Sequence, residues 1–154
     1  MASRRWLFRL LGLYPPYLGA GIRVKASLDL RTFEVRLRLR WWNRNFVGTH
    51  FGGSLYAMCD PFFMLILIEA LGPGYVVWDK SATIRFRRPG RGTVAATFHI
   101  PQEKIDEIRA AADAGGKVEP VFQAEVMNEK GEVVAEIEKL LYVRLKDAKL
   151  RPLP

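Results

Sequence analysis

The chain has 154 residues, of which 49% are hydrophobic and 26% are charged, and its formal net charge is +8. This length and composition are typical of one globular domain with a sizeable core. The single cysteine, Cys59, excludes an intramolecular disulfide and a cysteine-based metal cluster, and we interpret it as a small buried side chain. The positive charge favours an anionic partner but does not identify one.

Residues 1–18 are interpreted as an N-terminal extension rather than a signal peptide. Arg9 interrupts its apolar stretch, and no small-residue cleavage site accompanies Tyr14-Pro15-Pro16. We expect a short amphipathic helix here that ends before the prolines. The cytoplasm is then the expected location, and the polar residues 146–154 are expected to form a frayed tail.

Two strands are expected over residues 21–30 and 32–41. In the second, apolar and charged side chains alternate, as in an antiparallel strand with one buried face. The arginines of this strand are expected to face solvent. The row predicted to face the core consists of Phe33, Val35, Leu37, Leu39 and Trp41.

The longest apolar run predicts a central helix over residues 53–71, which Gly72-Pro73-Gly74 ends. A helix that is apolar all round is buried on all sides or crosses a membrane. The uninterrupted run falls short of the roughly 20 residues that a bilayer requires and contains Asp60 and Pro61, so we expect no transmembrane segment. Because a buried carboxylate costs free energy unless it is paired or used, Asp60 is the main functional clue.

The remaining elements predict an α+β domain that covers residues 1–154. We expect an antiparallel sheet wrapped around the central helix, with a further short helix beside it. Six strands cannot close around that helix alone, so a second subunit is expected. Trp78-Asp79-Lys80 is interpreted as a surface turn. The later elements are predicted as strands over 75–88, 93–100, 118–127 and 132–145 and a helix over 102–114.

Several common site signatures are missing from the sequence. It contains no GxxxxGK[ST], GxSxG or HExxH motif. His50 and His99 lie in different predicted elements, so no metal site is expected. Nucleic-acid binding is not favoured, because the aromatic residues of the strand over 32–41 alternate inward while its arginines alternate outward.

The remaining candidate constellation lies where a loop leads into the central helix. Free backbone N–H groups of Gly52 and Gly53 could hold a carbonyl oxygen as it becomes negatively charged. Asp60, about two turns further along, could act as a general base on water or as a nucleophile. From the residues alone, close packing explains the two glycines equally well.

The segment HFGGSLYAMCD, residues 50–60, resembles the motif of hotdog-fold acyl-CoA thioesterases of the phenylacetyl-CoA type. In that family His-Gly-Gly precedes the central helix, and the catalytic aspartate follows at the spacing between Gly53 and Asp60. IRFRRPGRGTV, residues 84–94, also resembles the family. The patterns GGSLYAM-DPF and VWDK-ATIRF--PGRG are most similar to a hotdog family labelled as a domain of unknown function. The resemblance covers roughly residues 43–100 and the closing hairpin, and it implies a hotdog fold.

The resemblance also implies roles for individual residues. Asp60 would be the base or nucleophile and the Gly53 N–H the oxyanion donor, while Asn45 or His50 would orient the thioester or the water. Coenzyme A would enter as part of an acyl-CoA or similar thioester, with no separate cofactor. The site would lie between subunits of a homodimer or a dimer of dimers. Substrate contacts would come from Gly52, from Phe62 and Phe63 along an apolar acyl tunnel, and from Arg88 and Arg91 at the phosphates.

The sequence departs from the family motif at two positions. Phe51 is inserted between His50 and the glycines, which changes where the histidine points. Pro61 removes a backbone donor and frees the Ala57 carbonyl, so we expect a kink at the candidate base.

Three functions remain open at this point. The favoured one is hydrolysis of an acyl-CoA thioester. The alternative is a hotdog protein that binds an acyl-CoA or fatty-acyl chain without catalysis. A third, weaker alternative is a nucleic-acid or membrane-surface protein that uses the positive charge and the N-terminal helix.

Overall fold

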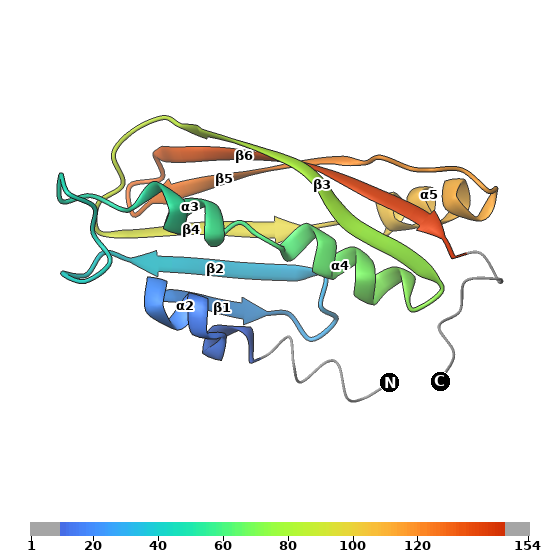
Figure 1. Cartoon of the computed structure of the whole chain (residues 1–154), viewed down its shortest axis with the longest axis horizontal. Coiled ribbons are helices and arrows are strands. Elements are labelled where there is room, and N and C mark those ends of the chain that lie inside the picture. Colours follow the sequence, from blue (N-terminus) through green and yellow to red (C-terminus); the bar gives the residue numbers. More distant parts are fainter. Residues whose placement is uncertain (1–9, 147–154) are drawn as a thin grey trace.

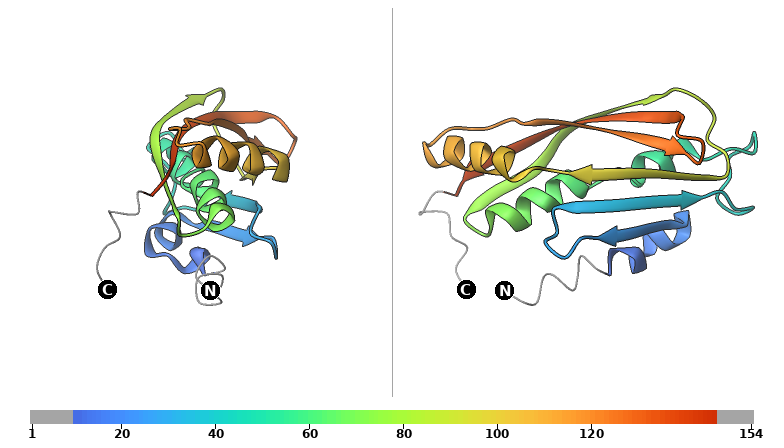
Figure 2. Two further views of the ribbon diagram at one scale, coloured as in Figure 1. Left: turned by 90° about the vertical axis from the view of Figure 1, so that its right-hand side faces the viewer. Right: turned by 180° about the vertical axis from the view of Figure 1, so that it is seen from behind.

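The computed structural model describes residues 10–146, and in it six strands form one antiparallel sheet in the order β1-β2-β4-β5-β6-β3. The sheet curls around the central helical segment (Figures 1 and 2). This is the expected α+β architecture, with β3 at one edge. The strands are Ile22–Ala26 (β1), Thr32–Arg38 (β2), Tyr75–Phe86 (β3), Thr93–His99 (β4), Val121–Asn128 (β5) and Val133–Leu145 (β6), and the helices are Pro15–Ala20 (α2), Gly52–Ala57 (α3), Phe62–Leu71 (α4) and Gln102–Asp113 (α5).

The period-two pattern of β2 predicted its faces correctly up to the end of the strand. Phe33, Val35 and Leu37 are buried, and the Phe33 ring lies 5.3 Å from that of Phe62 in α4. The prediction for Trp41 was wrong, because β2 ends at Arg38 and Trp41 is 79% exposed. The pattern continued by coincidence into a turn.

The N-terminal prediction did not include a helix that begins at the prolines. The predicted helix before them falls mostly on residues 1–9, which lie outside the described residues, as do residues 147–154 of the predicted tail. After a short 3-10 turn over Leu11–Leu13, Pro15 begins helix α2. Proline is well suited to the first turn of a helix because the N–H that it lacks would have no partner within the helix there.

The central helix is interrupted, as the proline predicted, and forms the two helices α3 and α4. Met58 ends α3, and α4 begins after Pro61, with a cis peptide bond between Asp60 and Pro61. By length and composition alone, the whole stretch Gly52–Leu71 is the one candidate membrane span among residues 10–146. In the fold it packs against the sheet, which explains why it is apolar.

The loop between β2 and α3 is tied to the rest of the fold by Asn43, which is 8% exposed. Its side-chain oxygen accepts from the Arg40 N–H at 2.7 Å, and its amide nitrogen donates to the carbonyls of Ala20 and Arg38, each at 2.9 Å. One side chain therefore links the end of β2, the end of α2 and the start of the loop.

Replacement of this side chain tests its contribution to the fold. We expect Asn43→Ala to lower the free energy of unfolding by about 1–2 kcal/mol, because it removes three partly buried hydrogen bonds. Urea unfolding measures the change. Gln102→Ala, which removes one exposed hydrogen bond to Asp106, is the control. A loss no larger than that of the control would show that Asn43 does not hold the loop.

Candidate active site

A groove of about 500 Å³ opens where α3 begins, between the loop before this helix and the turn that follows β3. Its lining includes five of the residues singled out from the sequence, namely Asn45, His50, Gly52, Arg88 and Arg91. The groove therefore brings together two segments that lie about 40 residues apart in the chain. Gly53 and Asp60 do not line it.

The two glycines at the start of α3 lie beneath aromatic rings. A Cβ on Gly52 would approach the Phe86 ring to 3.1 Å, and a Cβ on Gly53 would approach the Phe51 ring to 2.4 Å. A side chain at position 53 would therefore displace the exposed ring of Phe51. Within the described residues, no acceptor lies in hydrogen-bonding geometry to the N–H groups of Gly52 or Gly53. Both groups could donate to a ligand.

His50 lies in the wall of this groove and is 3% exposed. Its Nε2 donates to the Gly92 carbonyl at 3.0 Å, so Nε2 carries the hydrogen, and Nδ1 is buried without a partner. Burial lowers the pKa of His50, and the hydrogen bond to Gly92 opposes this only in part. The ring is therefore neutral at pH 7 and can accept a hydrogen bond at Nδ1.

Asn45 holds the loop in shape. Its oxygen accepts from the N–H groups of Val47 and Thr49, and its amide nitrogen donates to the Thr49 hydroxyl and the His50 carbonyl. The hydrogen bond to the His50 carbonyl fixes the backbone at His50, so Asn45 positions that residue. A direct contact of Asn45 with substrate stays a prediction.

The mouth of the groove is basic. Arg87 pairs with Glu136 and Arg88 pairs with Glu132, each at 2.7 Å. Arg91 is exposed, and within residues 10–146 it has no ion-pair partner. Of the two arginines predicted to meet phosphates, Arg91 is the one available to a new anion.

Asp60 belongs to a second cluster at the break between α3 and α4. Its Oδ1 lies 2.5 Å from Nζ of Lys139, and the same nitrogen lies 3.1 Å from Oδ2 of Asp79. The Lys139 side chain is 1% exposed, whereas that of Asp60 is 40% exposed. The ammonium also lies 5.5 Å from the centre of the Tyr56 ring. A buried cation thus lies between two carboxylates, one of which reaches solvent.

The sequence contains a signal for Lys139 that the motif search missed. Lys139 lies in the row of β6 that faces the core, between Ile137 and Leu141, which are 1% and 0% exposed. A charged residue in such a row requires partners. The partner Asp79 was wrongly predicted in a surface turn; it lies in β3, beside an irregularity in the pairing of β3 with β6.

The charges of this cluster follow from its surroundings. Burial raises the pKa of Asp79, which the hydrogen bond from Lys139 only partly offsets. Burial alone would lower the pKa of Lys139, but the hydrogen bonds and charges of Asp60 and Asp79 outweigh it and raise this pKa. Lys139 is therefore a cation at neutral pH. Oδ1 of Asp79 is buried without a partner.

Phe62 and Phe63, predicted to line an acyl tunnel, lie in the core of the described chain. They are 0% and 3% exposed. Phe62 stacks on Phe98 and Phe63 stacks on Phe122, each at 4.9 Å between ring centres. Their contact with substrate stays a prediction.

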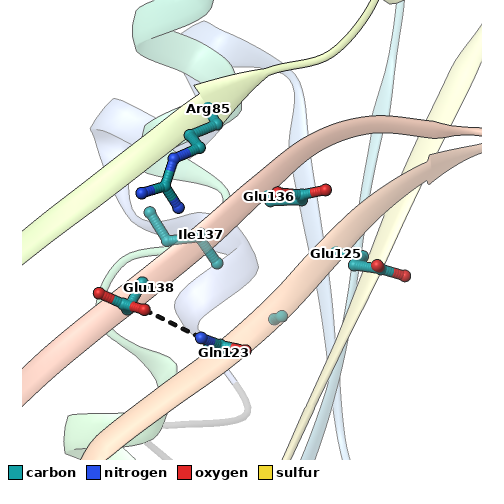
Figure 3. A pocket seen from close by; sticks show the side chains of 7 residues that line it. Arg85, Gln123, Glu125, Glu136, Ile137 and Glu138 are labelled. Atoms are coloured by element: carbon teal, nitrogen blue, oxygen red, sulfur yellow. Dashed lines mark hydrogen bonds between the residues drawn. The ribbon is translucent and has the colours of Figure 1, made fainter.

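A separate groove of about 280 Å³ lies on the outer face of the sheet, over β3, β5 and β6 (Figure 3). Three of its polar side chains pair with neighbours: Gln123 donates to Glu138 at 2.9 Å, and Glu136 pairs with Arg87. No residue predicted from the sequence lines it. Among residues 10–146, no group of three or more His, Cys, Asp or Glu side chains could hold a metal ion.

Solved structures with the same fold include three bacterial proteins. One, from Pseudomonas aeruginosa, is described as a protein of unknown function and probable thioesterase; it is 23% identical with a TM-score of 0.81, over 93% of this chain and 96% of that one. A thioesterase from Haemophilus influenzae is 18% identical with a TM-score of 0.66, over 90% and 88%. The PaaI protein of the phenylacetic acid degradation operon of Escherichia coli is 20% identical with a TM-score of 0.62, over 92% and 93%.

These likenesses confirm the expected hotdog fold. No curated protein sequence matches the chain at a significant level. The sequence profile of one family, described as Domain of unknown function (DUF4442), matches residues 4–143. The chain therefore belongs to this family, and its fold is that of the hotdog thioesterases.

Proposed function

We propose that the protein hydrolyses the thioester bond of an acyl-CoA, with Asp60 as the reacting carboxylate. The observation that carries this proposal is the position of Asp60. Its carboxylate lies at the interruption of an otherwise apolar central helix, reaches solvent, and is held by a buried ammonium. Carboxylates in such surroundings are typical of catalytic sites. The motif around Asp60 and the thioesterases among the similar folds support the reaction class.

The proposed reaction needs few groups. Asp60 takes a proton from water as the water oxygen bonds to the thioester carbon, or it attacks that carbon itself to give an anhydride that water then hydrolyses. The Gly53 N–H donates to the carbonyl oxygen as it gains negative charge. The carbon–sulfur bond breaks, the sulfur takes up a proton, and the products are a carboxylic acid and a thiol.

Two groups around the groove suit the rest of an acyl-CoA. Arg91 can meet phosphate oxygens of coenzyme A, because a guanidinium presents several N–H donors to them. His50 lines the groove, and its neutral Nδ1 has no hydrogen-bond partner, so a small shift of the ring would let it accept from water or from an amide N–H of the substrate. We assign the orienting role to His50 rather than to Asn45, whose side-chain oxygen and nitrogen already contact the loop.

We further propose that two copies of the chain form the complete site. The groove at the start of α3 does not include Asp60. A site that contains both the groove and Asp60 therefore needs residues from a second copy of the chain between them. Strand β3 is at the sheet edge, and its residues Ser81, Ala82 and Thr83 are exposed. An unpaired edge strand can pair with a second copy of itself.

One specific observation favours a second function, acyl-CoA binding without hydrolysis. The short contact with Lys139 engages one oxygen of Asp60, which makes that oxygen less available to accept a proton from water. A binding protein would retain the groove and Arg91 but would not depend on Asp60.

Thiol release from a panel of short, aromatic and long acyl-CoAs tests the proposal. We expect the wild-type protein to turn over at least one of them and Asp60→Asn to reduce kcat at least 100-fold while remaining folded, because the amide can neither take up a proton nor attack. Full activity in Asp60→Asn would place the site elsewhere. If neither protein releases thiol, the enzyme proposal fails, and acyl-CoA binding at equilibrium then decides for the second function.

Truncated thioesters of N-acetylcysteamine in the same assay test the recognition of coenzyme A. Loss of one charge-assisted hydrogen bond is expected to raise the KM of Arg91→Ala about tenfold for the acyl-CoA and to leave the truncated substrate unaffected. Arg23→Ala, in β1, is the matched control. An equal effect on both substrates would show that Arg91 does not read the phosphates.

Sedimentation equilibrium tests the proposed pairing of β3. We expect twice the chain mass of 17.6 kDa for the wild-type protein. The double change Ser81→Lys with Thr83→Lys should give the monomer mass, because it places like charges across the paired edges. Thr97→Lys, exposed on the interior strand β4, is the control. A wild-type monomer at the assay concentration would contradict the pairing.

A further inference from the structure

Lys139 occupies a position where a charged side chain needs a reason. It is 1% exposed and lies between Ile137 and Leu141 in the inward row of β6. Removing an ammonium from water costs several kcal/mol, and only well-placed partners offset that cost. Asp60, Asp79 and the Tyr56 ring supply such partners.

The contact joins three parts of the fold that are distant in the sequence. Lys139 comes from the middle of β6, Asp79 from the edge strand β3, and Asp60 from the break in the central helix. Lys139 and Asp60 are 79 positions apart. The hydroxyl of Tyr17 donates to the backbone carbonyl of Asp60 and fixes the same residue from the other side.

We propose that Lys139 is the positioning residue of Asp60: its buried ammonium binds Oδ1 and fixes the direction of the carboxylate at the helix break. Asp79 anchors the ammonium to the sheet. The reactive role of Asp60 rests on the proposed function, whereas the contact and its electrostatic effect do not. Lys139 itself does not touch the substrate.

The presence of two carboxylates around one ammonium has a consequence for pH. If both are ionised, the cluster carries one excess negative charge. Burial raises the pKa of Asp79. The hydrogen bond from Lys139 opposes this effect, and the charge of Asp60 adds to it. Asp79 is therefore suited to take up a proton as the pH falls. The ammonium is then left to Asp60 alone.

Burial keeps two further groups beside the cluster, Cys59 and Tyr17, in their neutral forms. Burial raises the pKa of the Cys59 thiol to about 12, although the charge of Lys139 opposes the effect. Burial also raises the pKa of Tyr17 above its usual range, and the charge of Asp60 adds to this rise. Tyr56 contributes the face of its ring. The acid limb of an activity profile would therefore report proton uptake by the cluster, which is favoured at Asp79.

Steady-state kinetics from pH 4 to pH 9 test this role in wild type, Lys139→Met and Lys139→Arg. We expect Lys139→Met to lower kcat about 100-fold at pH 7.5 with KM changed less than about threefold, because binding does not use Lys139. The midpoint of the acid limb should move upward by about one pH unit, because Asp79 loses the hydrogen bond and the charge of Lys139 that oppose the effect of burial on its pKa. Lys139→Arg should recover at least about a tenth of the wild-type kcat. Lys130→Met, in the exposed turn between β5 and β6, is the control.

A spectroscopic measurement separates this inference from the proposed function. Carboxyl ¹³C shifts of labelled aspartate report the titration of Asp79, with Asp79→Asn to assign the signal. We expect Lys139→Met to raise the pKa of Asp79 further, because the opposing effect of the ammonium is removed. This result is expected whether or not the protein releases thiol. An unchanged Asp79 titration overturns the inference.

The kinetic outcomes are equally decisive if the protein proves to be a thioesterase. A folded Lys139→Met protein with wild-type kcat and an unmoved acid limb overturns the positioning role. If Lys139→Met does not fold, the double variant Lys139→Met with Asp79→Asn removes the carboxylate left buried without a partner. We expect the double variant to fold and to show the same loss of kcat; wild-type kcat in the double variant also overturns the inference.

Discussion

The structure depends on the pairing of one buried ammonium, that of Lys139, with two carboxylates. Lys139 lies in the apolar interior between the sheet and the central helix, and an isolated charge there would be strongly destabilising. Two carboxylates compensate it, and they come from elements on both sides of that interior. The contact therefore has two effects: it allows a charge in the core, and it fixes the position of Asp60 relative to the sheet.

The interruption of the central helix follows from the same requirement. The segment Gly52–Leu71 is apolar because the sheet curls around it, and at its interruption the Asp60 side chain is 40% exposed. Pro61 ends the hydrogen bonding of α3, so the chain turns at Asp60 and begins again as α4. The carboxylate then reaches solvent on one side and Lys139 on the other. The basic groove lies at the start of the same segment and does not include Asp60. In the proposed site, a second copy of the chain supplies the walls that join the groove to Asp60.

Local patterns predicted most of the fold but only part of the candidate site. Alternation and turn residues were sufficient for the strands, and the glycine motif directed attention to His50 and Gly52, which line one groove. Trp41 was misplaced because the alternation continues beyond Arg38, where β2 ends, into the turn that Asn43 closes onto Arg40. Asp79 was misplaced because its partner is distant in sequence, and no local pattern reports a pairing between β3 and β6. The inward row of β6 did identify Lys139 as unusual, but only the fold shows which carboxylates compensate it.

The most direct test of this account is a double-mutant cycle on the free energy of unfolding, with wild type, Lys139→Met, Asp60→Asn and the double variant. If the ion pair between Lys139 and Asp60 stabilises the fold, the two changes in the free energy of unfolding are strongly non-additive, with a coupling energy of about 1–3 kcal/mol. Effects that add within about 0.3–0.5 kcal/mol would show that the two groups act independently and would contradict the account.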